Sequence, residues 1–230
     1  MKVLIIIPAY NEEGNILNVV GELEKKYPQY DYVVVNDGST DKTLELCKKH
    51  NFNYVDLPIN LGLSGAFQTG MKYAKEYGYD YSLQFDGDGQ HNPKYIADMV
   101  ETMEKEEIDI AIGSRFVTEK KPLTMRMLGS RLIQFCIKIT SGINIADPTS
   151  GMRMYNKRMI EKFETELNYG PEPDTVAYLV RCGAKVKEVQ VEMSERMAGE
   201  SYLNFSRTIK YMTNMCTSIL LFQWFRRKEL

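Results

Sequence analysis

The sequence predicts one α/β domain built on a mainly parallel sheet. The chain has 230 residues, of which 43% are hydrophobic and 26% charged, so it can bury one substantial core. Short runs of β-branched and other apolar residues alternate with segments in which apolar side chains recur at helical spacing. Strands separated by helices of this length form βαβ units, in which the strands run parallel.

The predicted elements follow one another in regular order. The runs that predict strands are residues 3–7, 32–35, 53–57, 81–85 and 108–112. The segments that predict helices are residues 15–26, 41–50, 65–77 and 93–105. Parallel sheets of this kind bind ligands beyond the carboxyl ends of their strands, which tells us where to look for a site.

Charge and cysteine content exclude some classes of protein. A formal net charge of −2 and a pI near 5.9 give no overall attraction to nucleic acid, so no nucleic-acid partner is expected. The four cysteines lie far apart, without a C-x-x-C pair, which is typical of free thiols in a reducing cytoplasm. The apolar run at the N-terminus is too short for a signal peptide and predicts a buried strand.

Polar and acidic segments follow four of the predicted strands. They are residues 8–13, 36–41, 86–91 and 113–115. Because the carboxyl ends of parallel strands meet at one edge, these segments predict a polar, negatively charged crevice there.

Asp86 and Asp88 are separated by one glycine directly after the fourth strand. Hard cations such as Mg²⁺ or Mn²⁺ take carboxylate oxygens together with substrate phosphates, so the pair predicts a metal and diphosphate site. A calcium-binding loop is disfavoured, since its sixth and twelfth positions hold His91 and Ala97 instead of Gly and Glu. An aspartyl phosphatase would not normally have Gln90 here, and a plain surface turn stays open.

A second acidic segment follows the second strand. Asp37 stands directly at the strand end, where it can accept hydrogen bonds from a nucleotide base or ribose. Ser39, Thr40 or Asp41 can cap the following helix, and a cap is the favoured interpretation of Asp41.

Taken together, the chain resembles the family-2 glycosyltransferases, and among them the polyprenyl-phosphate glycosyltransferases similar to dolichol-phosphate mannose synthase. The resemblance spans about residues 3–205, and each motif is weak alone but their order and spacing are specific. The matching stretches are residues 7–13, 35–41, 60–65, 86–91, 113–115, 147–153 and 196–201.

The resemblance implies a nucleotide-diphosphosugar transferase fold of GT-A type that binds a nucleotide-sugar donor. Residues implied around the nucleoside are Pro8, Tyr10, Glu12 and Asp37. Residues implied at the Mg²⁺ or Mn²⁺ ion and the diphosphate are Asp86, Asp88 and Gln90, with Asp88 also taken as catalytic. Arg196, in an R-x-x-G-x-S segment, would meet the donor diphosphate, although Tyr202 replaces the Lys or Arg of many relatives.

Two arginines are the predicted binding residues for the acceptor. A guanidinium can bind a phosphate through two parallel hydrogen bonds, so Arg115 and Arg131 are candidates for an acceptor phosphate, with ordinary salt bridges as the alternative. Asp147 either orients the acceptor, acts as a base or caps the turn at residues 148–151. Glu172, in an acidic turn before a helix that begins at Pro173 and runs to Arg181, is a hypothetical contact of the sugar.

The C-terminal segment predicts an amphipathic helix. We expect a catalytic domain at residues 1–202 and an extension at residues 203–230, whose longest apolar run of four residues is too short to span a membrane. Trp224 and the basic residues 226–228 favour a peripheral position at the cytoplasmic face of the cell membrane. Packing on the chain's own domain or on a second copy is the alternative. Many relatives carry transmembrane helices after this point, so a small membrane protein is an expected partner.

These features predict inverting transfer of a hexose, with glucose or N-acetylglucosamine from a uridine donor favoured, to polyprenyl phosphate. The expected acceptor is bacterial undecaprenyl phosphate, for cell-wall or surface polysaccharide. A transferase of the same fold that extends a saccharide is the alternative. From other classes, an aspartyl phosphatase and a non-catalytic membrane scaffold remain.

Overall fold

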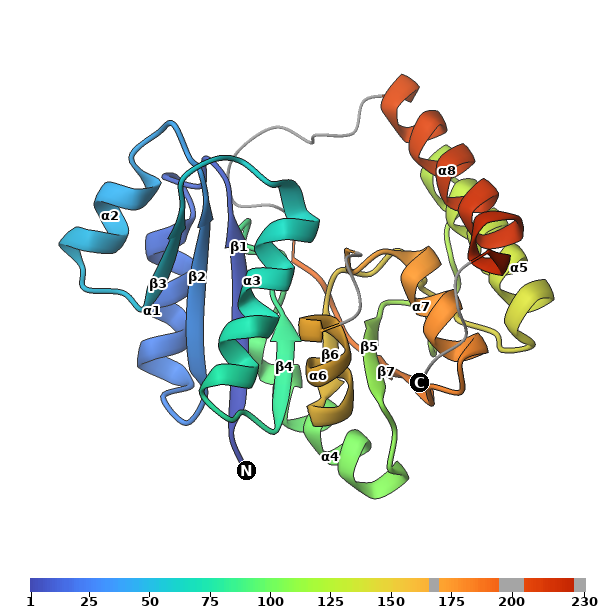
Figure 1. The fold of residues 1–230 in the computed structure, drawn as a ribbon. Helices are drawn as coiled ribbons and strands as arrows, with labels where there is room; N and C mark the ends of the chain where they lie inside the picture. The colour runs from blue at the N-terminus through green and yellow to red at the C-terminus, as the bar shows by residue number, and fades with distance from the viewer. Residues whose placement is uncertain (166–169, 195–204, 226–230) are drawn as a thin grey trace.

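The computed structural model describes residues 1–165, 170–194 and 205–225. These residues form one seven-stranded sheet with helices on both faces (Figure 1). The strands are β1 (Val3–Ala9), β2 (Asp31–Asp37), β3 (Tyr54–Leu57), β4 (Tyr81–Gln84), β5 (Ile110–Ser114), β6 (Arg153–Asn156) and β7 (Val186–Gln190). The helices are α1 (Ile16–Lys26), α2 (Thr43–Lys49), α3 (Gly62–Glu76), α4 (Ile96–Glu106), α5 (Met125–Ser141), α6 (Lys157–Thr165), α7 (Pro173–Arg181) and α8 (Phe205–Leu220), with short 3-10 turns η1 (Pro93–Tyr95) and η2 (Phe222–Trp224).

The sheet is mainly parallel, as the sequence predicts. Its strand order is β3-β2-β1-β4-β6-β5-β7. The pairs β1 with β2, β1 with β4, β2 with β3 and β5 with β7 are parallel, whereas β6 is antiparallel to both β4 and β5. The carboxyl ends of β1, β2 and β4 therefore meet at one edge of the sheet.

All five predicted strands and four predicted helices are present, with ends displaced by a few residues. The helix that begins at Pro173 and ends at Arg181 is confirmed, with Pro173 in its first turn. The strands β6 and β7 and the helices α5 and α6 were not predicted. The boundary expected at residues 202 and 203 lies outside the described residues.

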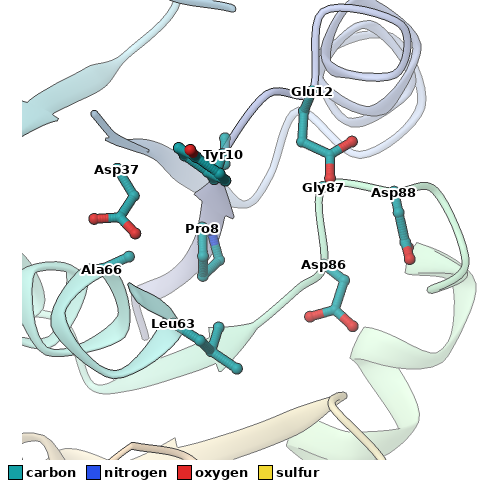
Figure 2. Close-up of a pocket in the computed structure, with 10 residues that line it drawn as sticks. Pro8, Tyr10, Glu12, Asp37, Leu63, Ala66, Asp86, Gly87 and Asp88 are labelled. Atoms are coloured by element: carbon teal, nitrogen blue, oxygen red, sulfur yellow. The ribbon is translucent and has the colours of Figure 1, made fainter. Parts of the chain in front are cut away.

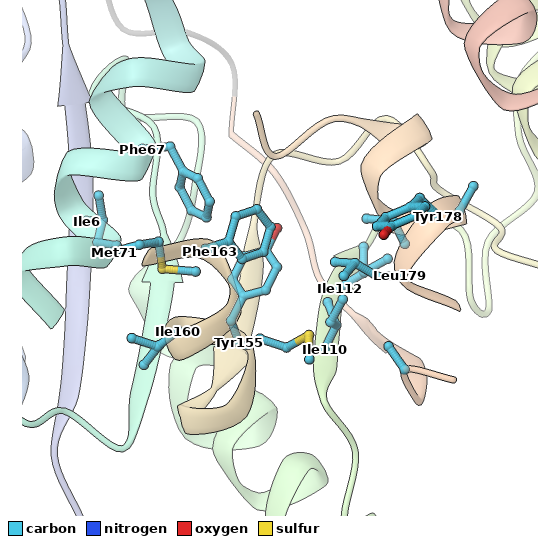
Figure 3. Packing of buried hydrophobic residues seen from close by; sticks show 14 of the residues in the cluster. Ile6, Phe67, Met71, Ile110, Ile112, Tyr155, Ile160, Phe163, Tyr178 and Leu179 are labelled. Atoms are coloured by element: carbon cyan, nitrogen blue, oxygen red, sulfur yellow. The ribbon is translucent and has the colours of Figure 1, made fainter. Parts of the chain in front are cut away.

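The sheet is buried on both faces because β1 is apolar on both. Leu4 and Ile6 pack with α3 and α6, whereas Val3, Ile5 and Ile7 pack with α1 and α4. On the first side the rings of Phe67, Tyr155 and Phe163 pack with centroids 5.2–5.5 Å apart (Figure 3). Continuous apolar strands are what a sheet covered on both faces requires.

The helices α5 and α8 lie side by side, on the far side of α7 from the N-terminal strands (Figure 1). A Cβ added to Gly129 would overlap the side chain of Met212, and the thiols of Cys136 and Cys216 interact further along. The two helices therefore run in the same direction.

None of the helices in the described ranges has the length and apolar character needed to cross a bilayer.

Candidate active site

A pocket of about 320 Å³ opens at the edge where β1, β2 and β4 end (Figure 2). Its lining residues are Pro8, Ala9, Tyr10, Glu12, Asp37, Leu63, Ala66, Asp86, Gly87 and Asp88. Six of them are residues that the sequence motifs singled out. Asp37 lies on the β2 side of the pocket, and Asp86 and Asp88 lie on the β4 side. The fold thus brings together acidic residues that are about fifty positions apart in the chain.

Asp37 is almost fully buried and fixes the loop that leads into α3. Its Oδ1 accepts a hydrogen bond from the backbone N–H of Leu61 at 2.7 Å. Gly38 follows with φ 63°, and a Cβ there would come within 2.6 Å of the Asn60 backbone nitrogen. Glycine adopts this left-handed conformation without strain, and only a residue without a Cβ allows this close approach. Asp37 therefore supports the pocket wall at the same time as it faces the pocket.

Asp41 lies one residue before the N-cap of α2, which is Lys42, so it is not the cap residue itself but still binds the first residue of the helix. Its Oδ1 accepts hydrogen bonds from the backbone N–H and the hydroxyl of Thr43, at 2.9 and 2.6 Å. Its Oδ2 accepts the backbone N–H of Glu13 at 3.0 Å. Asp41 thereby ties the loop after β2 to the loop after β1.

The Asp86–Asp88 loop is folded back on itself by His91. The backbone N–H of Asp86 donates to His91 Nδ1 at 2.9 Å, so a neutral imidazole carries its proton on Nε2. That Nε2 lies 3.5 Å from Asp86 Oδ2. Asp88 Oδ1 accepts the backbone N–H of Gln90 at 3.0 Å. The sequence motifs gave His91 no role, because its contact with Asp86 depends on how the loop folds.

The donor set fits a hard divalent cation held jointly with a substrate. Asp86 and Asp88 offer carboxylate oxygens, and the Asp86 side chain is 35% exposed towards the pocket. Within the part of the chain that the structure describes, no group of three or more His, Cys, Asp or Glu side chains is placed to hold a metal ion by itself. Mg²⁺ is commonly held by one or two carboxylates, with substrate phosphates and water completing its coordination.

Asp147 and Arg115 form a charged pair beyond β5. Arg115 Nε donates to Asp147 Oδ2 at 2.7 Å, and Nη2 donates to Oδ1 at 2.9 Å. Asp147 is fully buried, whereas the Arg115 side chain is 23% exposed. Glu188 of β7 accepts the backbone N–H groups of Ala146 and Asp147, at 2.6 and 2.7 Å. Both members of the pair are therefore held in place, with Arg115 facing outwards.

The loop at residues 147–151 joins this pair to the acidic pocket. The Ser150 hydroxyl donates to the backbone carbonyl of Gly113, next to the end of β5. At Gly151, an added Cβ would lie 2.8 Å from Asp86 Oδ2. One loop thus contacts Arg115 at one end and Asp86 at the other.

Lys121 and Arg131 add two cations near Arg115. Arg131 Nη2 donates to the Lys121 carbonyl at 2.8 Å, and Lys121 Nζ donates to Ser130 Oγ at 3.1 Å and to Gln134 Oε1 at 3.0 Å. Burial lowers the pKa of Lys121, while the charges of Asp147 and Glu188 oppose that shift. We call Arg115, Lys121 and Arg131 the cation cluster. The sequence reasoning missed Lys121, whose only signal is its place just before α5.

Glu172 precedes α7 and contacts α8. Its Oε2 accepts a hydrogen bond from the Tyr211 hydroxyl at 2.6 Å. A role for Glu172 towards the sugar stays a prediction. Arg196 and Tyr202 lie outside the described residues.

The mainly parallel sheet and the acidic pocket at its strand ends are those of a GT-A type fold. A similar fold is found in glucosyl-3-phosphoglycerate synthase from Mycobacterium tuberculosis, solved with Mn²⁺, UDP and glucosyl-3-phosphoglycerate. The TM-score is 0.66 at 17% identity, covering 96% of this chain and 79% of the other.

Residues 4–163 match the model of glycosyl transferase family 2, and the chain belongs to this family. It is 30% identical to an undecaprenyl-phosphate mannosyltransferase from Micrococcus luteus, over 89% of this chain and 88% of that protein. It is 33% identical to a UDP-N-acetylglucosamine–dolichyl-phosphate N-acetylglucosaminyltransferase from Methanococcus voltae, over 72% of this chain and 73% of that one.

Proposed function

We propose that this chain transfers a hexose, with inversion, from a nucleotide diphosphosugar to a polyprenyl phosphate. The observation that carries the proposal is the loop at residues 147–151, which contacts both the acidic pocket and Arg115 of the cation cluster. A diphosphate-binding pocket and a phosphate-binding cluster joined by one loop suit a reaction between two phosphorylated substrates. The names of the relatives from Micrococcus luteus and Methanococcus voltae support a lipid phosphate acceptor.

The chemistry of the pocket supports the donor side of the proposal. Pro8, Tyr10, Glu12, Asp37, Asp86 and Asp88 line the pocket. The first four would contact the nucleoside, and the two aspartates, together with Gln90, would hold Mg²⁺ or Mn²⁺. When bound, the metal would supply positive charge that offsets the negative charge growing on the leaving nucleoside diphosphate. Arg196 is proposed as a further diphosphate contact.

A phosphate acceptor needs little general acid or base catalysis. A phosphomonoester has a second pKa of about 6, so at neutral pH its oxygen is already largely deprotonated and can attack the anomeric carbon. Arg115 and Arg131 bind the acceptor phosphate, and positioning and charge stabilisation then account for most of the catalysis. Asp147 acts through Arg115, because both of its oxygens accept hydrogen bonds from that guanidinium.

We propose UDP-glucose or UDP-N-acetylglucosamine as the donor and undecaprenyl phosphate as the acceptor, for bacterial cell-wall or surface polysaccharide. The two relatives are named for mannose and for N-acetylglucosamine, so the sugar has to be measured. The expected location is the cytoplasmic face of the membrane. Membership of family 2 favours transfer over an aspartyl phosphatase or a scaffold.

The test is transfer of radiolabel from UDP-glucose, UDP-N-acetylglucosamine and GDP-mannose to undecaprenyl phosphate in membranes of expressing cells. We expect one donor to label the organic phase, with loss of label in EDTA and in Asp88→Asn. The matched control is Asp31→Asn, an exposed carboxylate at the opposite end of β2. If no donor labels lipid although the nucleotide binds with metal, transfer to a saccharide becomes the better hypothesis.

A further inference from the structure

The helix α5 is apolar on both of its faces. The side chains that it packs inwards are Met127, Ile133, Cys136 and Ile137, each at most 6% exposed. On the opposite face, four side chains that are 49–61% exposed are Leu128, Leu132, Phe135 and Ile139, which we call the outer stripe. A helix with a second apolar face, besides the one that packs on its own domain, usually buries that face against another protein surface or against lipid. Within the described residues, the outer stripe is left uncovered.

More exposed apolar side chains follow the neighbouring helix, although one face of the Trp224 ring is covered by Arg181 of α7. Just after α8, side chains that are 56–87% exposed are Leu221, Phe222, Trp224 and Phe225. Because α5 and α8 lie side by side and run in the same direction, these residues follow the same end of the helix pair as Ile139. Scattered apolar side chains are ordinary on a protein surface, but a row along one helix with aromatic residues beside it marks an interaction surface.

The charges around this surface indicate what it contacts. Residues 116–141 hold five Lys and Arg and a single Glu, and residues 205–225 hold two Lys and Arg and no acidic residue. The rest of the chain holds 30 acidic and 22 basic residues. Arg131 and Lys138, seven residues apart, flank the outer stripe. This distribution complements an anionic lipid surface.

A second copy of the chain is a poorer occupant of the outer stripe. The spacing of four, three and four residues would suit a helix pair, but a twofold contact, whether parallel or antiparallel, would bring Arg131 and Lys138 close to the same two cations of the second copy. Neither α5 nor α8 contains an acidic residue that could offset that repulsion.

We infer that α5 lies in the plane of an anionic bilayer, with its outer stripe inserted among the lipids and α8 beside it. Seventeen residues of helix are about 25 Å long, and none of the described helices is apolar enough to span, so an in-plane orientation is the one that buries the stripe. Lys121 and Arg131 then lie at the level of the lipid headgroups. The lipid binding inferred here does not depend on the proposed function, because it requires no catalysis. Only the significance of Lys121 and Arg131 at the headgroup level, as part of an acceptor-phosphate site, rests on that function.

The experiment is co-sedimentation of the full chain with vesicles of phosphatidylcholine alone and of phosphatidylcholine mixed with phosphatidylglycerol. The variant Leu132→Ser/Phe135→Ser removes the centre of the outer stripe, and Tyr77→Ser is the matched control, because Tyr77 is 57% exposed at the far end of α3. We expect the wild type to bind the mixed vesicles. The double variant should bind about tenfold more weakly or worse, the control as the wild type, and Lys138→Glu more weakly on mixed vesicles only.

Thermal unfolding of each variant establishes that it is folded, which is expected because both substituted side chains are exposed. Equal binding of the wild type and the double variant, or no binding of the wild type to mixed vesicles, overturns the inference. So does a dimer in sedimentation that the double variant converts to a monomer without any vesicle binding. Binding of UDP with Mn²⁺ by calorimetry, in the absence of vesicles, tests the donor site separately from the lipid surface.

Discussion

At the scale of single residues, the surroundings of Asp147 bear on its role. A general base needs an oxygen that reaches the acceptor, whereas both oxygens of Asp147 accept hydrogen bonds from Arg115 and the residue is fully buried. A positioning role explains this geometry better than proton transfer, because the acceptor phosphate is already ionised.

We predict that Asp147→Asn raises the KM for the lipid acceptor about tenfold with a smaller change in kcat, because Arg115 loses its charged partner. Unfolding should also become easier by about 2 kcal/mol. Steady-state kinetics and thermal unfolding measure both effects. The matched control is Asp109→Asn, which weakens another pair with a buried carboxylate, to the half-exposed Arg158, and should lower stability without changing KM. A fall in kcat alone, with an altered pH profile, would instead identify Asp147 as a base.

A substitution at Gly151 tests the contact between the loop at residues 147–151 and Asp86. A methyl group there would lie 2.8 Å from Asp86 Oδ2 and 3.3 Å from His91 Cε1, so either the carboxylate or the loop must move. We predict that Gly151→Ala lowers kcat/KM about a hundredfold, as displacement of a catalytic group by about 1 Å does. Gly21→Ala in α1, where nothing lies within 4 Å of the added methyl, should keep full activity. Equal activity of the two variants would contradict the contact.

The sequence located the acidic residues of the site but not the groups that hold them. Asp37, Asp86 and Asp88 could be found because they directly follow apolar strands. His91 and Lys121 could not, since their partners are a backbone amide and the side chains of another segment. Such contacts depend on loop conformation, which leaves no periodic pattern in the sequence.

At the scale of elements, the N-terminal half was predictable because its strands are long apolar runs buried on both faces. The strand β6 has four residues and begins with Arg153, a residue that ordinarily argues against a buried strand. Arg153 is tolerated because its guanidinium donates to the backbone carbonyls of Pro148 and Pro171. Those partners come from turns outside the strand, so the pattern of β6 alone could not reveal it.

The packing of α8 on α7 gives a prediction at this scale. The Tyr211 hydroxyl donates to Glu172, and the Ser218 hydroxyl donates to Asp174. Burial raises the pKa of Tyr211, so the hydroxyl keeps its proton as a donor. We predict that Tyr211→Phe lowers the free energy of unfolding by about 1–3 kcal/mol, because Glu172 loses a hydrogen bond to its charge. Thr213→Ala, at an exposed position of α8, should change it by less than about 0.5 kcal/mol, and denaturant titration separates the two.

At the scale of the whole molecule, the proposed function has the two substrates bind at opposite ends of the loop at residues 147–151. The donor pocket is formed at the ends of β1, β2 and β4, and the cation cluster lies between the end of β5 and α5. The same helix α5 that carries Arg131 carries the outer stripe. A water-soluble donor and a membrane-embedded acceptor would thus approach from different directions.

Ligand-dependent stability tests the donor side of this arrangement directly. A ligand at about a hundred times its Kd stabilises the folded state by about 2.7 kcal/mol. For a chain of this size each kcal/mol raises Tm by about 2–4 °C, so UDP with Mn²⁺ should raise it by about 5–10 °C. EDTA and Asp86→Asn should each remove most of the shift, because the diphosphate then lacks the cation that joins it to the carboxylates, while Asp31→Asn should keep it. A shift of the same size with EDTA would mean that the nucleotide binds without the metal, and Asp86 and Asp88 would need another role.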